Sequence, residues 1–315
     1  MSDASSGLPV CGVVGLGAMG MGIARSLKRA GLEVVGCDVS AASRKTFEDE
    51  GGQCVAEASA LAARCDVILL VVVNADQVMS VLFGDGKDKD DGLATQLAAG
   101  SLVIQCATVA PSVAETLGQR LDQAGLLMLD APISGGAAKA ATGELSVMAS
   151  GTPQAFAKAA PVLDAMAATV HHLGDVPGPG SSVKLVNQHL AGVHIAAAAE
   201  AMALGLRMGI DGRALYRVIT QSAGNSWMFE NRVPHILDGD YRPLSAVDIF
   251  VKDLNIVHDT GRELRLAMPV ASSALQQFTA ASGMGLGRED DSAVVKVYAA
   301  TGGVALPAAN DESVQ

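Results

Sequence analysis

A lysine stands among small and apolar residues in the segment GPGSSVKLVNQ, which covers residues 178–188. Charged side chains are seldom fully buried unless they are paired or have a chemical role. On a helix, Asn187 and Gln188 lie three and four residues after Lys184, so one face carries a cation and two amides. A partly dehydrated lysine has a lowered pKa and can accept a proton from a hydroxyl group. Lys184 is therefore a candidate general base with Asn187 and Gln188 as substrate ligands, and a snorkelling or salt-bridged lysine is the alternative.

A glycine-rich turn lies near the start of the chain, where a GxGxxG pattern follows the β-branched run 10–14 and opens a predicted helix, 19–30. In this context the first glycine permits a tight turn and the second lets a pyrophosphate approach the backbone. The third lets helix and strand pack closely. The phosphates would meet the positive N-terminal end of the helix. A turn without a ligand is the alternative. The residues predicted to bind the dinucleotide are Gly15, Leu16, Gly17, Ala18, Met19 and Gly20.

A second strand-like run, residues 33–37, ends immediately before Asp38. This is the position at which a dinucleotide-binding unit places a carboxylate that grips a ribose 2′-hydroxyl. The charge of Asp38 would repel a 2′-phosphate, and Arg44 and Lys45 are expected in solvent, so the sequence predicts NAD as the cofactor. Further cofactor contacts are expected where later strands end in loops, at Val73, Asn74 and Thr108.

The segment DAPISGGAAKAA supplies a candidate site for a substrate carboxylate. A strand ends at Asp130, Pro132 stiffens the turn, and glycines then precede a helical run. Backbone N–H groups at such a helix start bind anions, and a serine hydroxyl adds a donor. We therefore expect Ser134, Gly135 and Gly136 to bind substrate, and an ordinary glycine-rich helix entry is the alternative.

Two charged segments follow in the last third of the chain. Residues 245–259 predict a helix that carries Lys252 beside Asp253. Lys252 is a candidate contact to the cofactor or to the substrate carboxylate, and a structural ion pair is the alternative. The acidic run at 289–291 is expected to be the capped, solvated start of another helix.

These residues need elements that hold them in place. Short β-branched runs alternate with Ala-rich segments through the first half, which predicts βαβ units and a mostly parallel sheet. After the Gly- and Pro-rich stretch 174–182 the pattern is helical. The predicted fold is an α/β Rossmann-type dinucleotide-binding domain followed by an all-α domain, linked by a long helix. The predicted strands are 10–14, 33–37, 67–73, 102–105, 126–130, 145–150 and 169–173. The predicted domains are 8–177, which binds NAD, and 178–305, which binds substrate and forms the dimer. Residues 306–315 are predicted to be a tail.

The bulk composition limits the class of partner. The chain has 315 residues and a net charge of −11, which argues against nucleic acid and anionic membranes but not against a small anionic hydroxy acid. The first residues lack the apolar core of a signal peptide, and the apolar stretch 190–210 carries His194, Glu200 and Arg207. We therefore expect a cytoplasmic protein without a membrane span. Neither the five cysteines nor the six histidines have the spacing of a metal site, so no metal is expected.

Four segments occur in the order GLGAMG, DAPISGG, GSSVKLVNQ and VKDL, and together they resemble the β-hydroxyacid dehydrogenase family, the 3-hydroxyisobutyrate dehydrogenase-like proteins. The resemblance spans residues 10–298 and implies an NAD(P)-binding domain, a helical domain, and homodimers or homotetramers. It also implies that Lys184 is catalytic, that 134–136 and Asn187 bind substrate, and that Thr108 and Lys252 contact cofactor or substrate. Where the family often has Ser-Thr this chain has Ala-Thr at 107–108, which removes one hydroxyl contact.

Within the family, the segments HIAAAAEAMAL, AGNSWMFENR, SAVDIFVKDL and EDDSAVVKVY are most similar to the L-threonate dehydrogenase branch. Members of that branch oxidise a four-carbon sugar acid at C2 with NAD, so the resemblance implies conversion of L-threonate to 2-dehydro-L-erythronate. Oxidation of 3-hydroxyisobutyrate and reduction of tartronate semialdehyde are alternatives on the same scaffold. A non-catalytic binding module and an imine reductase also use this fold, but they lack the lysine that this chain retains.

Overall fold

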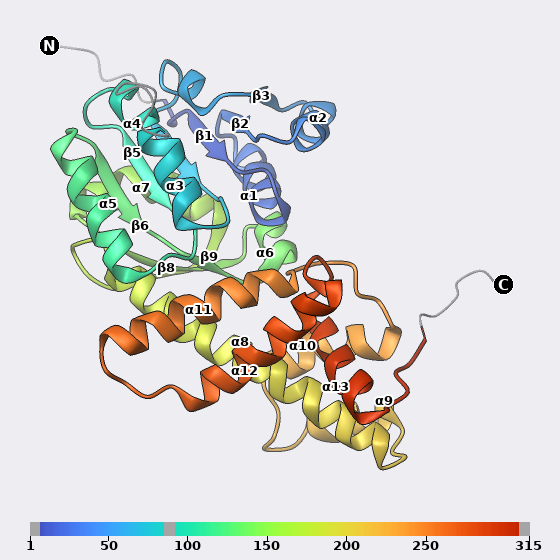
Figure 1. The fold of residues 1–315 in the computed structure, drawn as a ribbon. Helices are drawn as coiled ribbons and strands as arrows, with labels where there is room; N and C mark the ends of the chain where they lie inside the picture. Colours follow the sequence, from blue (N-terminus) through green and yellow to red (C-terminus); the bar gives the residue numbers. More distant parts are fainter. Residues whose placement is uncertain (1–6, 85–91, 309–315) are drawn as a thin grey trace, which may run out of the picture. The chain divides into compact units, whose positions relative to one another are not determined.

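The structure is a computed structural model that describes residues 7–84 and 92–308. Its chain divides into two compact units that meet in sequence between Lys184 and Leu185. The first unit is built from strands and helices and the second from helices (Figure 1), so the predicted fold class is confirmed.

The first unit follows the predicted alternation of strands and helices. Its strands are β1 (Cys11–Val14), β2 (Val34–Cys37), β3 (Gln53–Val55), β4 (Val67–Leu70), β5 (Leu102–Gln105), β6 (Leu127–Asp130), β7 (Ile133–Ser134), β8 (Leu145–Gly151) and β9 (Ala167–His172). Its helices are α1 (Ala18–Arg29), α2 (Ala41–Asp49), η1 (Ala58–Leu61), α3 (Ala75–Phe83), α4 (Leu93–Gln96), α5 (Pro111–Gln123), α6 (Gly136–Thr142) and α7 (Pro153–Met166).

Within the described residues the strands form one sheet in the order β3-β2-β1-β4-β5-β6-β8-β7, with β9 paired to β8. The strands from β1 to β6 run parallel, and β1 lies between β2 and β4, which is where the strand order reverses. In open α/β sheets, ligands bind outside the carboxyl ends of the strands at such a point. The glycine-rich turn after β1 therefore stands at the expected place.

Two apolar cores lie on the two faces of this sheet. One face packs against α1, α2, α6 and α7 through residues such as Ile23, Phe47 and Val162. The other packs against α3, α4 and α5 through residues such as Leu82 and Leu117. Because both faces are covered, the central strands consist of continuous apolar runs, as in β4, where all four residues are buried.

Each of the seven predicted strands is present, with ends that differ by a few residues. The run 67–73 ends as a strand at Leu70, because pairing with both neighbours stops there and the chain turns into the loop before α3. Strands β3 and β7 are not anticipated from the sequence. Each has three residues or fewer and lies at an end of the strand order, so neither leaves a recognisable apolar period.

The second unit contains the rest of α8 and the helices that follow it. Apolar residues of α8, α10, α11, α12 and α13 form its main core, in which Phe250 and Phe278 stack with ring centroids 5.2 Å apart. Its elements are α8 (Pro179–Arg207), α9 (Gly212–Ile219), α10 (Trp227–Asp238), α11 (Val247–Glu263), α12 (Pro269–Ala281), η2 (Ser282–Leu286), η3 (Asp291–Val294) and α13 (Val295–Gly302).

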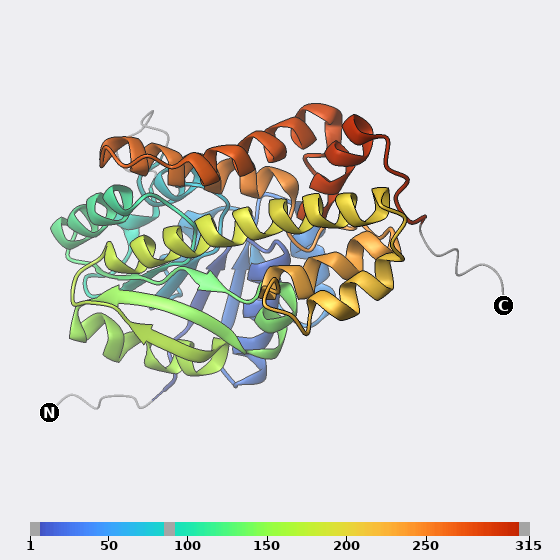
Figure 2. The ribbon, with the colours of Figure 1, turned by 90° about the horizontal axis from the view of Figure 1, so that it is seen from below.

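Helix α8 runs unbroken for 29 residues (Figure 2). In the described part of the chain it is the one helix long and apolar enough to cross a membrane, although 44% of its most apolar window is buried inside the structure. A Cβ at Gly192 would lie 3.0 Å from side-chain atoms of Leu254 and Phe250, so α11 packs closely on this part of α8. This packing agrees with the prediction of a buried helix.

The acidic run 289–291 contains the predicted helix cap, because the Asp290 side chain accepts a hydrogen bond from the N–H of Ser292 in η3, but the run is not solvated as the sequence predicts. Asp290 and Asp291 are fully buried. Arg232 donates two hydrogen bonds to Asp291, at 2.5 and 3.1 Å, and His235 Nδ1 lies 3.0 Å from Asp290 Oδ1. Both partners come from α10, more than fifty residues earlier in the chain, so the local pattern does not reveal them.

Candidate active site

The glycine-rich turn has the geometry that the motif predicts. Gly15 adopts a φ of +95°, a conformation that other residues rarely take. A Cβ on Gly20 would lie 1.8 Å from the carbonyl oxygen of Gly15, so only glycine permits this packing. A Cβ on Gly17 would meet nothing within 4 Å, which leaves an open cradle over the start of α1. The residues present therefore fit a dinucleotide pyrophosphate.

The carboxylate of Asp38 lies beside this turn. Asp38 Oδ2 accepts a hydrogen bond from the backbone N–H of Leu16 at 2.6 Å, and Oδ1 accepts one from Ser40 at 2.7 Å. The side chain is half-buried and directly follows β2, the position at which the sequence predicts a ribose-binding carboxylate. Arg44, expected in solvent, instead donates from Nη1 to the backbone carbonyl of Asp38 at 2.5 Å. The arginine therefore supports the loop that carries the carboxylate.

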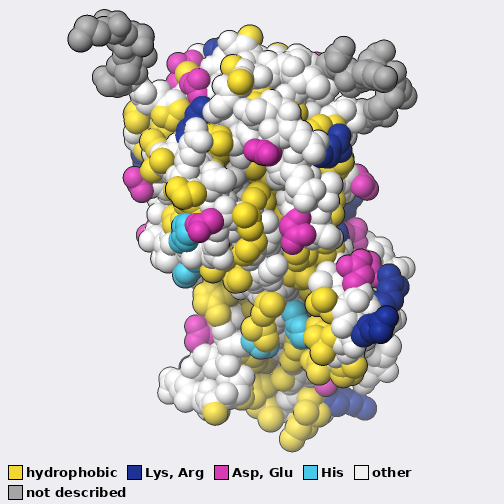
Figure 3. Space-filling view, turned by 90° about the vertical axis from the view of Figure 1, so that its left-hand side faces the viewer, with side chains coloured by type: hydrophobic (Ala, Val, Ile, Leu, Met, Phe, Trp, Pro, Cys, Tyr) yellow, Lys and Arg dark blue, Asp and Glu magenta, His cyan; other side chains and the backbone are white. Residues whose placement is uncertain are grey.

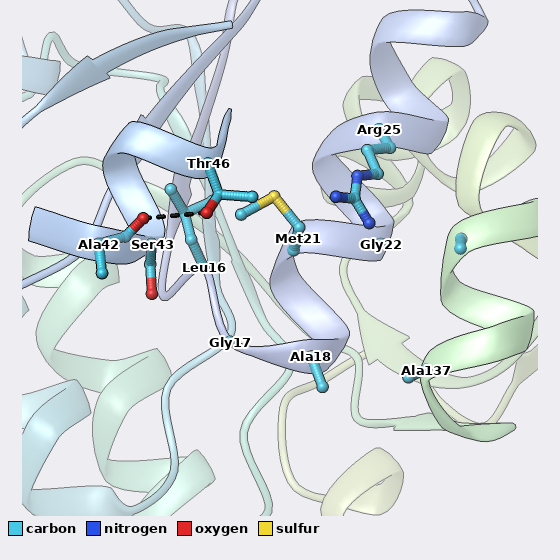
Figure 4. Close-up of a pocket in the computed structure, with 11 residues that line it drawn as sticks. Leu16, Gly17, Ala18, Met21, Gly22, Arg25, Ala42, Ser43, Thr46 and Ala137 are labelled. Atoms are coloured by element: carbon cyan, nitrogen blue, oxygen red, sulfur yellow. Dashed lines mark hydrogen bonds between the residues drawn. The ribbon is translucent and has the colours of Figure 1, made fainter. Parts of the chain in front are cut away.

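A hollow of about 530 Å³ lies beside the glycine turn and is walled by α1, α2 and α6 (Figure 4). Gly17 and Ala18 line it at the start of α1, and Thr46 of α2 lines it with its hydroxyl bonded back to Ala42. Asp38 is not among the lining residues. The hollow is connected to Asp38 through Leu16, which lines it and donates its N–H to the Asp38 carboxylate.

The other predicted cofactor residues lie in loops after β4 and β5. Asn74 caps α3 by accepting a hydrogen bond from the N–H of Gln77 at 2.9 Å, and Val73, which is about half exposed, donates its N–H to the same glutamine's Oε1. Thr108 is half-buried and follows a turn that buried Gln105 closes through hydrogen bonds with the backbone of Ala107. Each therefore occupies an ordered loop at the carboxyl edge of the sheet.

The segment 134–136 leaves β7 and enters α6. Gly135 and Gly136 have φ values of +133° and +75°, so the backbone turns through conformations that favour glycine. Helix α6 has only seven residues, so its macrodipole is small and the glycines' own N–H groups must supply most of any anion binding. Ser134 is half-buried on β7 and pairs in register with Ser146 of β8.

Lys184 lies within the first two turns of α8 and is only 8% exposed. The first turn of this helix is hydrogen-bonded to Asp130 and Ser150, at the ends of β6 and β8. These bonds keep the start of α8 with the α/β unit, so the division of the chain falls after Lys184, whereas the sequence places a domain boundary before residue 178.

Asn187, Gln188 and Lys252 belong to one polar chain within the helical unit. Asn187 Nδ2 donates to Gln188 Oε1 at 3.0 Å, and Gln188 Nε2 donates to Asp253 Oδ2. Lys252 Nζ lies 2.6 Å from Asp253 Oδ1. Asp253 is buried and accepts only, so it dictates which end of the Gln188 amide faces Asn187. The ion pair of Lys252, given as the alternative in sequence, is therefore present.

Three residues with clear positioning contacts are missed by the sequence reasoning: Gln105, Asp130 and Asp253. Each is a polar residue at or near the end of an apolar run, and each is fully or almost fully buried. Polar groups buried at such positions need partners. That position in the sequence is the signal that marks them as candidates.

The cysteine side chains are free and mostly buried. Among the described residues, Cys11, Cys37, Cys65 and Cys106 are buried and Cys54 is half-buried, and none forms a disulfide. Burial raises the pKa of Cys106 to about 12. Within residues 7–84 and 92–308, no three His, Cys, Asp or Glu side chains are grouped so that they could hold a metal ion.

An open phosphate cradle after β1, a carboxylate at the end of β2 and a buried lysine in the same α/β unit together define the class of NAD(P)-dependent oxidoreductases. Two family models match the chain. One, described as the NAD binding domain of 6-phosphogluconate dehydrogenase, covers residues 10–174. The other, described as NAD-binding of NADP-dependent 3-hydroxyisobutyrate dehydrogenase, covers residues 178–298. The chain belongs to the 3-hydroxyisobutyrate dehydrogenase-like family of β-hydroxyacid dehydrogenases, which confirms the resemblance inferred from its motifs.

Similar proteins extend over nearly the whole chain. An L-threonate dehydrogenase of Cupriavidus necator is 57% identical over 94% of this chain and 97% of its own length. An L-threonate dehydrogenase of Escherichia coli K12 is 51% identical over 95% of this chain and 96% of its own. The crystal structure of a 3-hydroxyisobutyrate dehydrogenase from Salmonella typhimurium superposes with a TM-score of 0.85 at 52% identity, covering 91% of this chain and 99% of that one.

Proposed function

We propose that the protein oxidises L-threonate to 2-dehydro-L-erythronate with NAD, and that Lys184 is the general base. The substrate is supported by the two relatives named L-threonate dehydrogenase. The observation that carries the chemistry is the burial of Lys184 on a helix whose start is bonded to Asp130, the residue from which the chain leads into segment 134–136.

The described residues divide the reaction among them. Segment 134–136 would bind the substrate carboxylate through backbone N–H groups and the Ser134 hydroxyl. Lys184 would take the proton of the substrate hydroxyl as the carbon–oxygen bond becomes a carbonyl. When bound, NAD accepts the hydride that leaves the same carbon. Asn187 and Gln188 would hold the substrate through amides whose orientation is set by Asp253, and Lys252 would contact cofactor or substrate.

The preference for NAD over NADP rests on Asp38. Its carboxylate is held by the N–H groups of Leu16 and Ser40, and its negative charge would stand against a 2′-phosphate. Arg44 is engaged with the backbone carbonyl of Asp38, so that contact would have to break before this cation could serve a phosphate.

The test is NADH formation with L-threonate, D-erythronate, D-glycerate and 3-hydroxyisobutyrate, each with NAD and with NADP. We expect turnover with L-threonate and NAD. Lys184→Ala should reduce kcat by about 10²- to 10⁴-fold while NAD affinity, measured by titration, stays nearly unchanged. Comparable turnover in the variant would refute the base role, and preferential turnover of 3-hydroxyisobutyrate would favour the alternative substrate.

We also infer that the protein is a homodimer or homotetramer in the cytoplasm and that the helical unit forms the subunit contacts. Hydrophobic side chains gather on the surface of this unit (Figure 3). Along α8, exposed apolar residues recur at helical spacing, which is the pattern of a contact face between identical subunits. These residues are Val186, Leu190, Ala197, Ala201 and Leu204, and exposed Met208 directly follows the end of the helix.

An experiment on this apolar face of α8 distinguishes a second copy of the chain from a lipid surface as the partner that covers it. Leu204→Glu should lower the mass measured by light scattering to that of a smaller assembly. The wild type should remain unbound in a flotation assay with anionic vesicles, as its net charge of −11 implies. Vesicle binding, or an unchanged mass, would contradict the assignment.

A further inference from the structure

We propose that Asp130 is a positioning residue that holds the start of α8, and with it Lys184, on the ends of β6 and β8, where the chain leads on to segment 134–136. The inference rests on the proposed function, because it gives Asp130 its effect through Lys184. It is carried by contacts that all lie within the α/β unit.

The carboxylate of Asp130 accepts hydrogen bonds from two residues at the start of α8, Gly178 and Ser181. Its side chain is fully buried at the end of β6. Oδ2 accepts from the N–H of Gly178 at 2.9 Å and from the N–H of Ser181 at 2.8 Å. Oδ1 accepts from the hydroxyl of Ser181 at 2.7 Å. A single carboxylate therefore fixes both the backbone and a side chain of the turn immediately before Lys184.

A second contact prevents this turn from sliding. The hydroxyl of Ser150 on β8 accepts a hydrogen bond from Gly180 N–H at 2.9 Å and lies 3.4 Å from Asp130 Oδ2. A Cβ on Gly180 would come within 2.6 Å of the backbone oxygens of Asp130 and Met148, so the helix start lies directly on the ends of β6 and β8. There is no room for the turn to shift toward the sheet.

The same aspartate is close in sequence to the other half of the proposed site. Only Ala131, Pro132 and Ile133 separate Asp130 from Ser134, and β7 pairs with β8, the strand that carries Ser150. Asp130 thus joins the strand that leads to the anion segment with the helix that bears the base. A displacement of about 1 Å between reacting groups can cost on the order of 100-fold in rate. The position of Lys184 is therefore expected to depend on this carboxylate.

The experiment compares Asp130→Asn with Asp291→Asn, a fully buried carboxylate in the helical unit that takes no part in the site. Asparagine keeps the size of Asp130 but replaces one acceptor by a donor that faces other donors. We expect kcat for the hydroxy acid to fall by about 10- to 100-fold in Asp130→Asn, with KM for NAD unchanged. Asp291→Asn should unfold at a lower temperature yet keep its kcat.

Two further measurements separate positioning from loss of fold. Ser181→Ala removes only the hydroxyl donor to Asp130 and should lower kcat in the same direction by a smaller factor. Hydrogen exchange of peptides covering 178–190 should become faster in Asp130→Asn while peptides of α1 stay protected. Unchanged exchange over 178–190, or a kcat loss matched by Asp291→Asn, would overturn the proposal. If the wild type oxidises no acid tested, the proposed function fails separately, and the exchange result alone decides whether Asp130 holds the turn.

Discussion

Asp130 and Asp291 are both fully buried carboxylates, one in each unit, yet their partners differ. Asp130 accepts from uncharged donors, and burial raises its pKa in spite of the hydrogen bonds from Ser181, Gly178 and Ser150. Asp291 faces a guanidinium, and burial raises its pKa to about 6 although Arg232 acts to lower it.

The difference separates two uses of a buried charge. Backbone N–H donors at a helix start orient the helix, so the cluster around Asp130 determines where a chemically important side chain stands. An ion pair between side chains of different elements ties those elements together, as Arg232 of α10 and Asp291 of η3 do. We therefore expect loss of the first cluster to affect rate and loss of the second to affect stability.

The largest effect should follow Arg232→Met. This change leaves Asp291 buried without its cation, which typically costs about 3–5 kcal/mol in free energy of unfolding. Urea unfolding followed by circular dichroism measures the loss. The matched control is Arg213→Met. Arg213 and its partner Asp238 are both about half exposed, so this change should lower the free energy of unfolding by only about 0–1 kcal/mol. Equal losses in both variants would remove the distinction between the two clusters.

A smaller effect is expected at Asp38, a half-buried carboxylate that, like Asp130, accepts from backbone N–H groups. Asp38→Ala should weaken NAD binding by roughly 10- to 100-fold, the range of a lost charge-assisted hydrogen bond. It should also reduce the difference in affinity between NAD and NADP. Fluorescence titration with both nucleotides measures this. Asp49→Ala on α2, which breaks only an exposed pair with Lys45, is the control and should leave both affinities unchanged. A wild type that prefers NADP would contradict the role of Asp38.

Asp253 tests whether a buried carboxylate that meets both an amide and a cation behaves like Asp130 or like Asp291. Asp253→Asn allows Gln188 to reverse its amide and present the wrong group to Asn187. We expect kcat/KM for the hydroxy acid to fall about tenfold, with a smaller loss of stability than in Arg232→Met. A loss of stability with kcat/KM retained would place Asp253 with the ion-pair cluster instead.

The smallest effect concerns the dependence of stability on pH at His235 and Asp290. The hydrogen bond that His235 donates to the Asp290 carboxylate raises the pKa of His235 above 6.5, so its stabilisation is complete below 6.5 and is lost as pH rises through the folded-state pKa. Burial alone would raise the pKa of Asp290, but bonds from His235 and Ser292 outweigh it and lower the pKa to about 2. That contribution is present above pH 3.8 and is lost as pH falls toward 2.

The measurement is the free energy of unfolding of the wild type and of His235→Asn across these two ranges. The difference between them should shrink by about 1 kcal/mol or less as pH rises above 6.5. A difference that stays constant with pH would show that His235 is not charged in the folded protein.

Much of the α/β unit could be predicted because its signals are local. The alternation of apolar runs, the glycines of the turn and the position of Asp38 all depend on neighbours within a few residues. The two short strands β3 and β7 escaped because pairing, rather than propensity, makes them strands. The antiparallel placement of β8 likewise depends on which strand it meets.

The amino-acid sequence by itself determined the identity and order of the chemical groups: the glycine turn, the carboxylate after β2, segment 134–136 and Lys184. Only the tertiary structure decided what surrounds the polar residues at the ends of apolar runs. Asp130 finds its donors about fifty residues later, Gln188 its acceptor 65 residues later, and Asp291 its cation 59 residues earlier. A sequence pattern records the period of one element, whereas a buried polar group is satisfied by whichever other element folding brings to it.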